Sequence, residues 1–528
     1  MKKKAIIVGG FFAVIMLTSL AAGVMVNNTP KQNMNSDNPE ITITGTPADH
    51  FPDAQRAQFC GSNNPKSTPF VKEFAIPTKC TNPLAIATDY SGNVWFAQTN
   101  TGNIAKFDPT TESFKEFNNS LWPKNGRSMI WGMDYSPDGS VWFTDESYDS
   151  IWQFTTQDEK YHRIAFPATG DTLPQKLKVD GSLIIINDFT GNKITFLDPT
   201  QTADNLKYLN LPSPVEGSVT GAFTIDSSKN VWYTNWIFQK GGVLVKFDQE
   251  GYRNALANAK GDTLPSLDHI KVYQLPFDLL TPNGIAASDD GKIWIADTSR
   301  SAIFSFDPAT EIFTPYVTSD PKPSTYGNAT GIIKSPISRP YWIKIAPEGQ
   351  LVFNEQTSNN ISVLDTKTDS LVEYMIPSKN PAWGDCEPNS DCGLAQIFDF
   401  SIYKNKIWFT EWVENNIGVV DTSVPLPFAI DLESKDITLK PGESKATSFI
   451  ISSQKDIPQM SLIVSYPDNF LNATSTTTSP FKLDSAPKSV DVLITAADDA
   501  IPGTYKILLG SQIEDISISK YVTVNILP

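Results

Sequence analysis

Short apolar runs separated by polar turns recur along most of the chain, and the most regular of these runs contain a tryptophan. Residues 93–108 (NVWFAQTNTGNIAKFD) and 406–421 (KIWFTEWVENNIGVVD) share a Trp-Phe pair, an Asn-Ile pair and a final Asp in one register. Such a repeat decides the fold class, because each copy is one supersecondary unit that buries its core against its neighbours.

The central run occurs seven times, each time after a turn such as YSGN, SPDGS or APEGQ. The copies are residues 94–98, 141–145, 183–188, 231–235, 293–297, 351–355 and 407–411. Consecutive apolar residues predict strands buried on both faces, as in a blade packed between two others. We therefore predict an all-β, seven-bladed β-propeller over residues 67–423, with the tryptophans filling the space between sheets.

The seventh copy lacks a fourth strand, since Asp421 is soon followed by VPLPF. Ahead of the first copy, PFVKEFAIP (69–77) resembles the fourth strands SFKEFNN (113–119) and SLVEYMIP (370–377). We expect this N-terminal strand to complete the last blade, which leaves no sheet edge open in the ring.

The two ends of the chain differ from the repeats. After Val424, alternating strands predict an immunoglobulin-like β-sandwich over residues 424–528, as a spacer or adhesion module. Three lysines precede a run that stays apolar from Ala5 to Val26, so residues 1–26 are either a cleaved signal peptide or a membrane anchor. Residues 27–66, rich in Asn, Pro and Ser, are expected to form a flexible stalk.

Charge and cysteines narrow the class of protein. A net charge of −16 argues against nucleic acid and anionic lipid as partners. Four cysteines suit an exported protein, because oxidising compartments favour disulfides. Three pairings are possible, and we expect Cys60–Cys80 together with the short loop Cys386–Cys392.

The last residue of every central strand is polar: Gln98, Asp145, Asp188, Asn235, Asp297, Glu355 and Glu411. Strand parity places all seven on the rim that carries the blade connections, and the insertions 250–281, 315–340 and 378–395 are expected to leave from the same rim. Either these side chains hydrogen-bond turn backbone, or the acids among them (Asp145, Asp188, Asp297, Glu355 and Glu411) hold Mg²⁺ or Ca²⁺. Aromatic residues nearby are candidate ligand contacts: Trp236, Tyr341, Trp342 and Trp412.

The motifs xGNVWFAQxxxGNIAKFDP and xIWFTEWxENNIGVVD resemble the repeat of the virginiamycin B lyase (streptogramin lyase) family, over roughly residues 69–421. More loosely they resemble NHL and gluconolactonase-type propellers. The resemblance implies a lyase that abstracts a proton with paired histidines, a glutamate and Mg²⁺. Glu355 matches that glutamate, but Tyr341, Trp342 and Ile343 stand where a histidine is expected. Of the three histidines, His50, His162 and His269, only His269 in an insertion could replace the base.

Three functions stay open. The first, which the missing histidines, the stalk and the C-terminal module favour, is an exported, membrane-tethered surface propeller that binds a ligand, a protein or a glycan without chemistry of its own. The second is a lyase or a lactonase-like hydrolase that depends on Mg²⁺ or Ca²⁺. The third is a structural component of a cell envelope.

Overall fold

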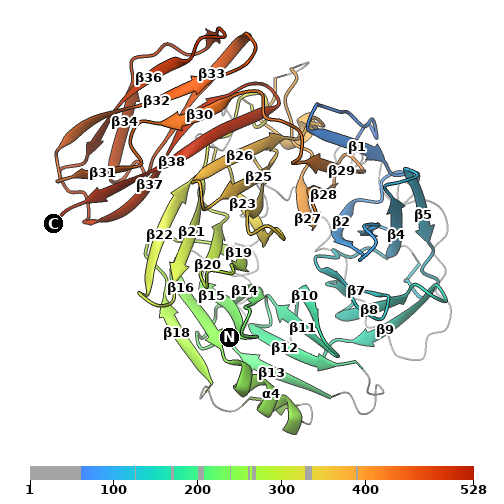
Figure 1. The fold of residues 1–528 in the computed structure, drawn as a ribbon. Helices are drawn as coiled ribbons and strands as arrows, with labels where there is room; N and C mark the ends of the chain where they lie inside the picture. The colour runs from blue at the N-terminus through green and yellow to red at the C-terminus, as the bar shows by residue number, and fades with distance from the viewer. Residues whose placement is uncertain are drawn as a thin grey trace.

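The computed structural model describes residues 61–124, 126–167, 172–199, 207–237, 240–259, 262–264, 269–327, 336–387 and 390–528. Seven blades of antiparallel strands are arranged in a ring (Figure 1), and their innermost strands contact one another in order around it. The predicted seven-bladed propeller is confirmed. In every blade the predicted central run is the second strand, buried between neighbouring sheets.

The first four blades follow the chain in order. Blade one is β2 (Pro83–Thr88), β3 (Val94–Gln98), β4 (Asn103–Asp108) and β5 (Ser113–Phe117). Blade two is β6 (Met133–Tyr135), β7 (Ser140–Asp145), β8 (Ser150–Thr155) and β9 (Lys160–Ala165). Blade three is β10 (Pro174–Asp180), β11 (Leu183–Asp188), β12 (Lys193–Asp198) and β13 (Lys207–Pro212), with the short β17 (Asp262–Thr263) at its edge. Blade four is β14 (Val219–Ile225), β15 (Val231–Ile237), β16 (Gly241–Phe247) and β18 (Ile270–Gln274).

The last blade takes a strand from the other end of the propeller sequence. Blade five is β19 (Pro282–Ala287), β20 (Ile293–Asp297), β21 (Ala302–Asp307) and β22 (Ile312–Val317). Blade six is β23 (Pro340–Ile345), β24 (Leu351–Glu355), β25 (Asn360–Asp365) and β26 (Ser370–Met375). Blade seven is β27 (Ile397–Tyr403), β28 (Lys406–Glu411), β29 (Asn416–Asp421) and the N-terminal β1 (Val71–Ala75), which pairs with β29 as predicted.

The C-terminal strands form two packed sheets. One sheet runs β30 (Ala429–Leu432), β32 (Ser444–Ser452), β36 (Lys488–Ala496) and β34 (Leu471–Ser475). The other runs β35 (Phe481–Leu483), β33 (Ile457–Ser465), β37 (Gly503–Gln512), β38 (Ile516–Ile526) and β31 (Asp436–Leu439). A β-sandwich is thus present, and its likeness to immunoglobulin domains stays a prediction.

The sandwich is joined to the propeller by strand pairing. β38 pairs antiparallel with β26 of blade six, from Ser370 opposite Lys520 to Tyr374 opposite Ile516. β37 meets β22 of blade five in a single parallel bridge between Tyr316 and Lys506. The β37–β38 hairpin therefore spans the outer edges of two blades (Figure 1), so this module is fixed to the ring instead of hanging from it.

Several predictions concern the N-terminal region and the cysteines. The proposed signal or anchor (1–26), most of the proposed stalk, His50 and Cys60 lie outside the described residues. The end of that stalk, residues 61–66, is hydrogen-bonded to the propeller, for example from the Gly61 amide to the Val413 carbonyl. Among the described residues no helix is long and apolar enough to cross a bilayer. The predicted Cys386–Cys392 disulfide is formed.

Candidate functional site

The seven polar residues at the second-strand ends are all fully buried. Six of them pair with the start of the innermost strand of their blade, and Asp145 ends β7 at the corresponding position. The topology therefore places all seven toward the predicted common rim. Asp297 accepts hydrogen bonds from the backbone amides of Leu280 and Thr281, at 2.8 and 2.9 Å. Asp188 accepts in the same way from Leu173 (2.8 Å) and Gly191 (2.9 Å). These carboxylates fasten the incoming connection to the blade, as turn chemistry requires.

The three aspartates proposed as Mg²⁺ or Ca²⁺ ligands are hydrogen-bonded to their own surroundings, and a metal at these acids stays a prediction. Asp145 receives hydrogen bonds from Ser128 and from the Trp152 indole. Burial raises the pKa of Asp145 to about 6, although these hydrogen bonds lower it. Over the described part of the chain, no three His, Cys, Asp or Glu side chains are grouped as metal ligands. Hard cations need several oxygen ligands at once, and here Asp145, Asp188 and Asp297 are each bonded within their own part of the ring.

Glu355 and Glu411 differ from the three aspartates, because each faces a second glutamate. Glu355 lies against Glu373 of β26, and Glu411 lies against Glu73 of β1. Ser362 donates to Glu355 Oε2 at 2.5 Å, while Glu355 Oε1 and Glu373 Oε2 have no donor. Burial and then the partner carboxylate raise the pKa of Glu355, to about 8, and that of Glu411 as well. The Glu355–Glu373 pair therefore holds a proton at neutral pH.

The aromatic candidates are packed into the interior. Trp236, Tyr341, Trp342 and Trp412 are all 5% exposed or less. Tyr341 packs against Trp342 at 4.5 Å between ring centroids, and Trp412 packs edge-on against Phe398 at 5.5 Å. Trp342 also lines the central channel.

The structure corrects the placement of His269 and of part of the insertion 250–281. Helix α4 (Gln249–Asn258) and His269 lie between the third and fourth strands of blade four, so they are on the face opposite the blade connections. His269 Nδ1 lies 3.5 Å from Asp248 Oδ2, next to the start of α4, and His162 lies on the outer strand β9. Neither histidine lines the central channel of the propeller. His162 belongs to blade two and His269 to blade four, whereas Glu355 belongs to blade six.

A cavity of about 510 Å³ lies in the central channel, and all seven innermost strands contribute to its lining. Its lining comes from the second halves of those strands and from Tyr90 in the first turn, so it lies toward the face of the first-to-second-strand turns. This face is opposite the insertion-bearing rim from which a ligand site was predicted.

Charged side chains inside the channel leave an excess of one positive charge. The lining contains Lys176, Lys178 and Lys344 against Asp134 and Asp399, three cations and two anions. Lys178 and Asp134 pair at 3.0 Å, with Lys178 largely exposed. In a chain of net charge −16, a cationic channel is a local reversal of sign that attracts anions.

Two lysines share one carboxylate in this channel. Lys176 Nζ lies 2.9 Å from Asp399 Oδ2, and Lys344 Nζ lies 3.0 Å from Asp399 Oδ1. The Lys176 ammonium also lies 4.2 Å from the ring centroid of Trp342, a cation–π contact. Burial lowers the pKa of Lys176 to about 8, Asp399 opposes this, and Lys344 lowers it further. Burial alone would raise the pKa of Asp399, but the two lysines outweigh it and hold that pKa below its ordinary value.

Sequence reasoning missed this cluster, although a signal was present. Lys344 interrupts the otherwise apolar first strand PYWIKI, and Asp399 interrupts the largely apolar IFDFSIY, whereas Lys176 lies in the more polar PQKLKVD. First strands of propeller blades line the channel, so a charged residue there is a channel residue.

Comparisons with known proteins agree with the fold. Two solved structures, a streptogramin B lyase and the virginiamycin B lyase of Staphylococcus aureus, each match at TM-score 0.50 and 19% identity. The matches cover 66% of this chain and 96% and 98% of those chains. Regucalcin from Agrobacterium tumefaciens matches at TM-score 0.35 and 16% identity, covering 55% of this chain and 89% of that one, which is too distant to support an argument. No protein-family model and no curated protein matches the sequence. At this identity the lyase likeness shows the propeller fold alone.

Proposed function

We propose that this chain is an exported surface protein whose propeller binds a small carboxylate or similar anion in its central channel. The observation that carries the proposal is the sharing of Asp399 by Lys176 and Lys344, which leaves one ammonium charge without a counter-charge inside the channel. The lysine-led apolar N-terminal run and the Cys386–Cys392 disulfide support export.

The expected binding mode follows from the donors available. Each ammonium has three N–H donors, and Asp399 uses one from Lys176. An incoming carboxylate accepts from the remaining donors of both lysines, and the apolar lining from Ile285, Ala286 and Ala287 contacts the rest of the ligand. Charge-assisted hydrogen bonds are worth about 1.5–3 kcal/mol each.

The test is calorimetric titration of the full chain with acetate, succinate and inorganic phosphate at low salt. Lys176→Met should weaken carboxylate binding about 10- to 100-fold. The control is Lys271→Met. Lys271 is exposed on β18, the outer strand of blade four, and pairs with Glu311, so this substitution should leave binding unchanged. Affinity should also fall as the pH rises through about 8, where Lys176 loses its proton. Absence of binding by all three anions, or equal binding by Lys176→Met, would reject the proposal.

Export is tested separately by treating intact cells with a protease. The propeller should be degraded without lysis if it lies outside the cytoplasm, and protection until lysis would count against export.

A further inference from the structure

Tryptophan occupies the second position of the central strand in five of the seven blades: Trp95, Trp142, Trp232, Trp294 and Trp408. These rings fill the space toward the next blade. Trp95 packs on Phe154 of blade two, and Trp232 packs on Phe306 of blade five.

The indole also anchors the preceding turn. Trp95 Nε1 donates to Asp89 Oδ2 at 3.1 Å, and Trp232 Nε1 donates to Asp226 Oδ2 at 2.8 Å. In both blades the aspartate lies six positions before the tryptophan. The tryptophan and the turn aspartate thus form a unit that closes the seam between blades.

Blade three lacks the tryptophan and replaces it from elsewhere in the chain. Ile185 stands at its position, and Tyr252 of α4 enters the seam and stacks on Phe196 at 5.1 Å between centroids. The Tyr252 hydroxyl donates to Asp180 Oδ2 at 2.8 Å, in the turn where blades one and four bond their indole. The insertion of blade four therefore supplies the missing ring and its hydrogen bond.

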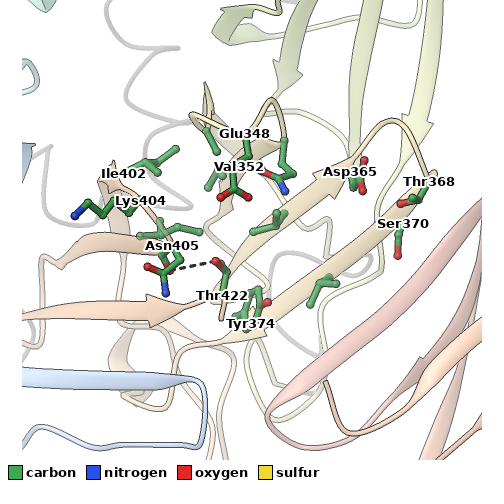
Figure 2. Close-up of a pocket in the computed structure, with 15 residues that line it drawn as sticks. Glu348, Val352, Asp365, Thr368, Ser370, Tyr374, Ile402, Lys404, Asn405 and Thr422 are labelled. Atoms are coloured by element: carbon green, nitrogen blue, oxygen red, sulfur yellow. Dashed lines mark hydrogen bonds between the residues drawn. The ribbon is translucent and has the colours of Figure 1, made fainter. Parts of the chain in front are cut away.

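Blade six lacks both members of the unit, and no described residue replaces them. Val352 stands at the tryptophan position and Ala346 six positions earlier. A cavity of about 290 Å³ lies at this seam, lined by both residues (Figure 2). Val352, Val363 and Val372 of blade six contribute to its apolar lining together with Ile402 and Ile407 of blade seven. The missing indole is thus matched by an open space at the place where an indole would lie.

The rim of this cavity is polar. Figure 2 shows Glu348, Asp365, Lys404, Asn405 and Thr422 around it, with Thr422 bonded to the Asn405 carbonyl. Glu348 lies in the turn between the first and second strands of blade six. In blade one the corresponding turn contains Asp89, which accepts the indole N–H of Trp95. Two carboxylates against one ammonium favour a neutral or cationic guest.

We propose that the seam between blades six and seven is a binding site for a planar aromatic molecule of about the size of indole that carries an N–H donor. The volume suffices, because apolar protein cavities of about 150 Å³ bind benzene. The flat shape follows from the two facing sheets, which in five other blades hold an indole ring in the corresponding space. This site shares only Ile402 with the lining of the channel and does not depend on the ligand proposed there.

The experiment uses indole itself as the probe, titrated into the full chain and followed by calorimetry. Val352→Trp supplies the missing ring covalently, so indole binding should be lost while the melting temperature stays equal or rises. Ile185→Val, at the corresponding position of blade three, is the matched control and should bind indole like the parent chain.

If Val352→Trp melts below the parent protein, Val352→Phe decides the matter, because a smaller ring still occupies the space and should weaken indole binding at least tenfold. Absence of saturable indole binding by the parent chain overturns the proposal. Binding that neither aromatic substitution changes overturns it as well, since the indole would then sit elsewhere.

Discussion

Glu355 and Gln98 occupy the same place in their blades but make different hydrogen bonds. The Gln98 amide donates to the carboxylate of Glu116 on the fourth strand. Glu355 faces Glu373 in the corresponding position and can bond to it only through a proton. Because two buried carboxylates in contact cannot both ionise at neutral pH, blade six depends on a proton where blade one depends on an amide.

Glu355→Gln should therefore flatten the pH dependence of stability. The folded-state pKa of Glu355 is raised from 4.5 to about 8, so the folded state keeps a proton that the unfolded chain releases. The unfolding free energy of the parent chain then falls as the pH rises between these values, by about 1.4 kcal/mol per unit at most. Urea unfolding at pH 5 and at pH 8 should show a smaller fall for Glu355→Gln.

The reciprocal change in blade one is the control. Gln98→Glu places a carboxyl group against Glu116 and should make the same fall in stability steeper. Equal pH slopes in the parent chain and both variants would mean that neither pair holds a proton.

The repeat predicted the positions of individual residues within each blade, but not their partners in other strands. The strand-end positions of Glu355 and Glu411 followed from the register of the repeat, and their burial is observed. Their partners could not be predicted, because Glu373 is reached across the strand β25 and Glu73 comes from the far end of the propeller sequence. Charged residues in first strands indicate that Lys176, Lys344 and Asp399 line the channel, but no local spacing could show that they meet, because they come from three blades.

At the scale of elements, helix α4 shows how an insertion can repair a repeat. Tyr252 is 3% exposed and provides blade three with both a ring and a donor to its turn. The repeat pattern predicted the central strand LIIIND, yet it could not show which segment fills the place of the missing tryptophan, since Tyr252 belongs to the next blade.

Tyr252→Ala should destabilise the protein by about 3–5 kcal/mol, the usual cost of removing a buried aromatic ring. Tyr252→Phe keeps the ring and loses only the bond to Asp180, which retains Lys229, so it should cost about 0.5–1.5 kcal/mol. Chemical unfolding measures both. Adding Ile185→Trp to Tyr252→Ala should restore part of the loss, and no recovery in that double variant would contradict the assignment of Tyr252 as the substitute ring.

At the scale of the whole molecule, the sandwich and the propeller share one sheet. Alternating residues after Val424 predicted the strands of the sandwich, but its pairing with β26 rests on backbone hydrogen bonds, which leave no pattern in side chains. The joint is also packed. Tyr521 is fully buried, donates to the Val317 carbonyl at 2.8 Å and meets Tyr316 edge-on at 5.1 Å.

A chain ending at residue 423 should therefore aggregate, although the seven blades remain complete. Truncation uncovers the edge of β26 and the buried side chains of Tyr316 and Leu371, and an exposed apolar edge strand is a template for intermolecular pairing. Size-exclusion chromatography of the truncated chain should show large species where the full chain elutes as a defined one.

Tyr521→Ala separates loss of the joint from loss of the whole sandwich. It removes the ring packed on Tyr316 and should cost about 3–5 kcal/mol. The backbone pairing of β26 with β38 stays, but calorimetry should then resolve two melting transitions, because the packed side chain no longer couples the two parts. Leu493→Ser, at an exposed position on β36 in the sandwich sheet that does not pair with the propeller, is the control and should keep one transition. A single, unshifted transition in Tyr521→Ala would mean that the Tyr521 ring does not couple the sandwich to the propeller.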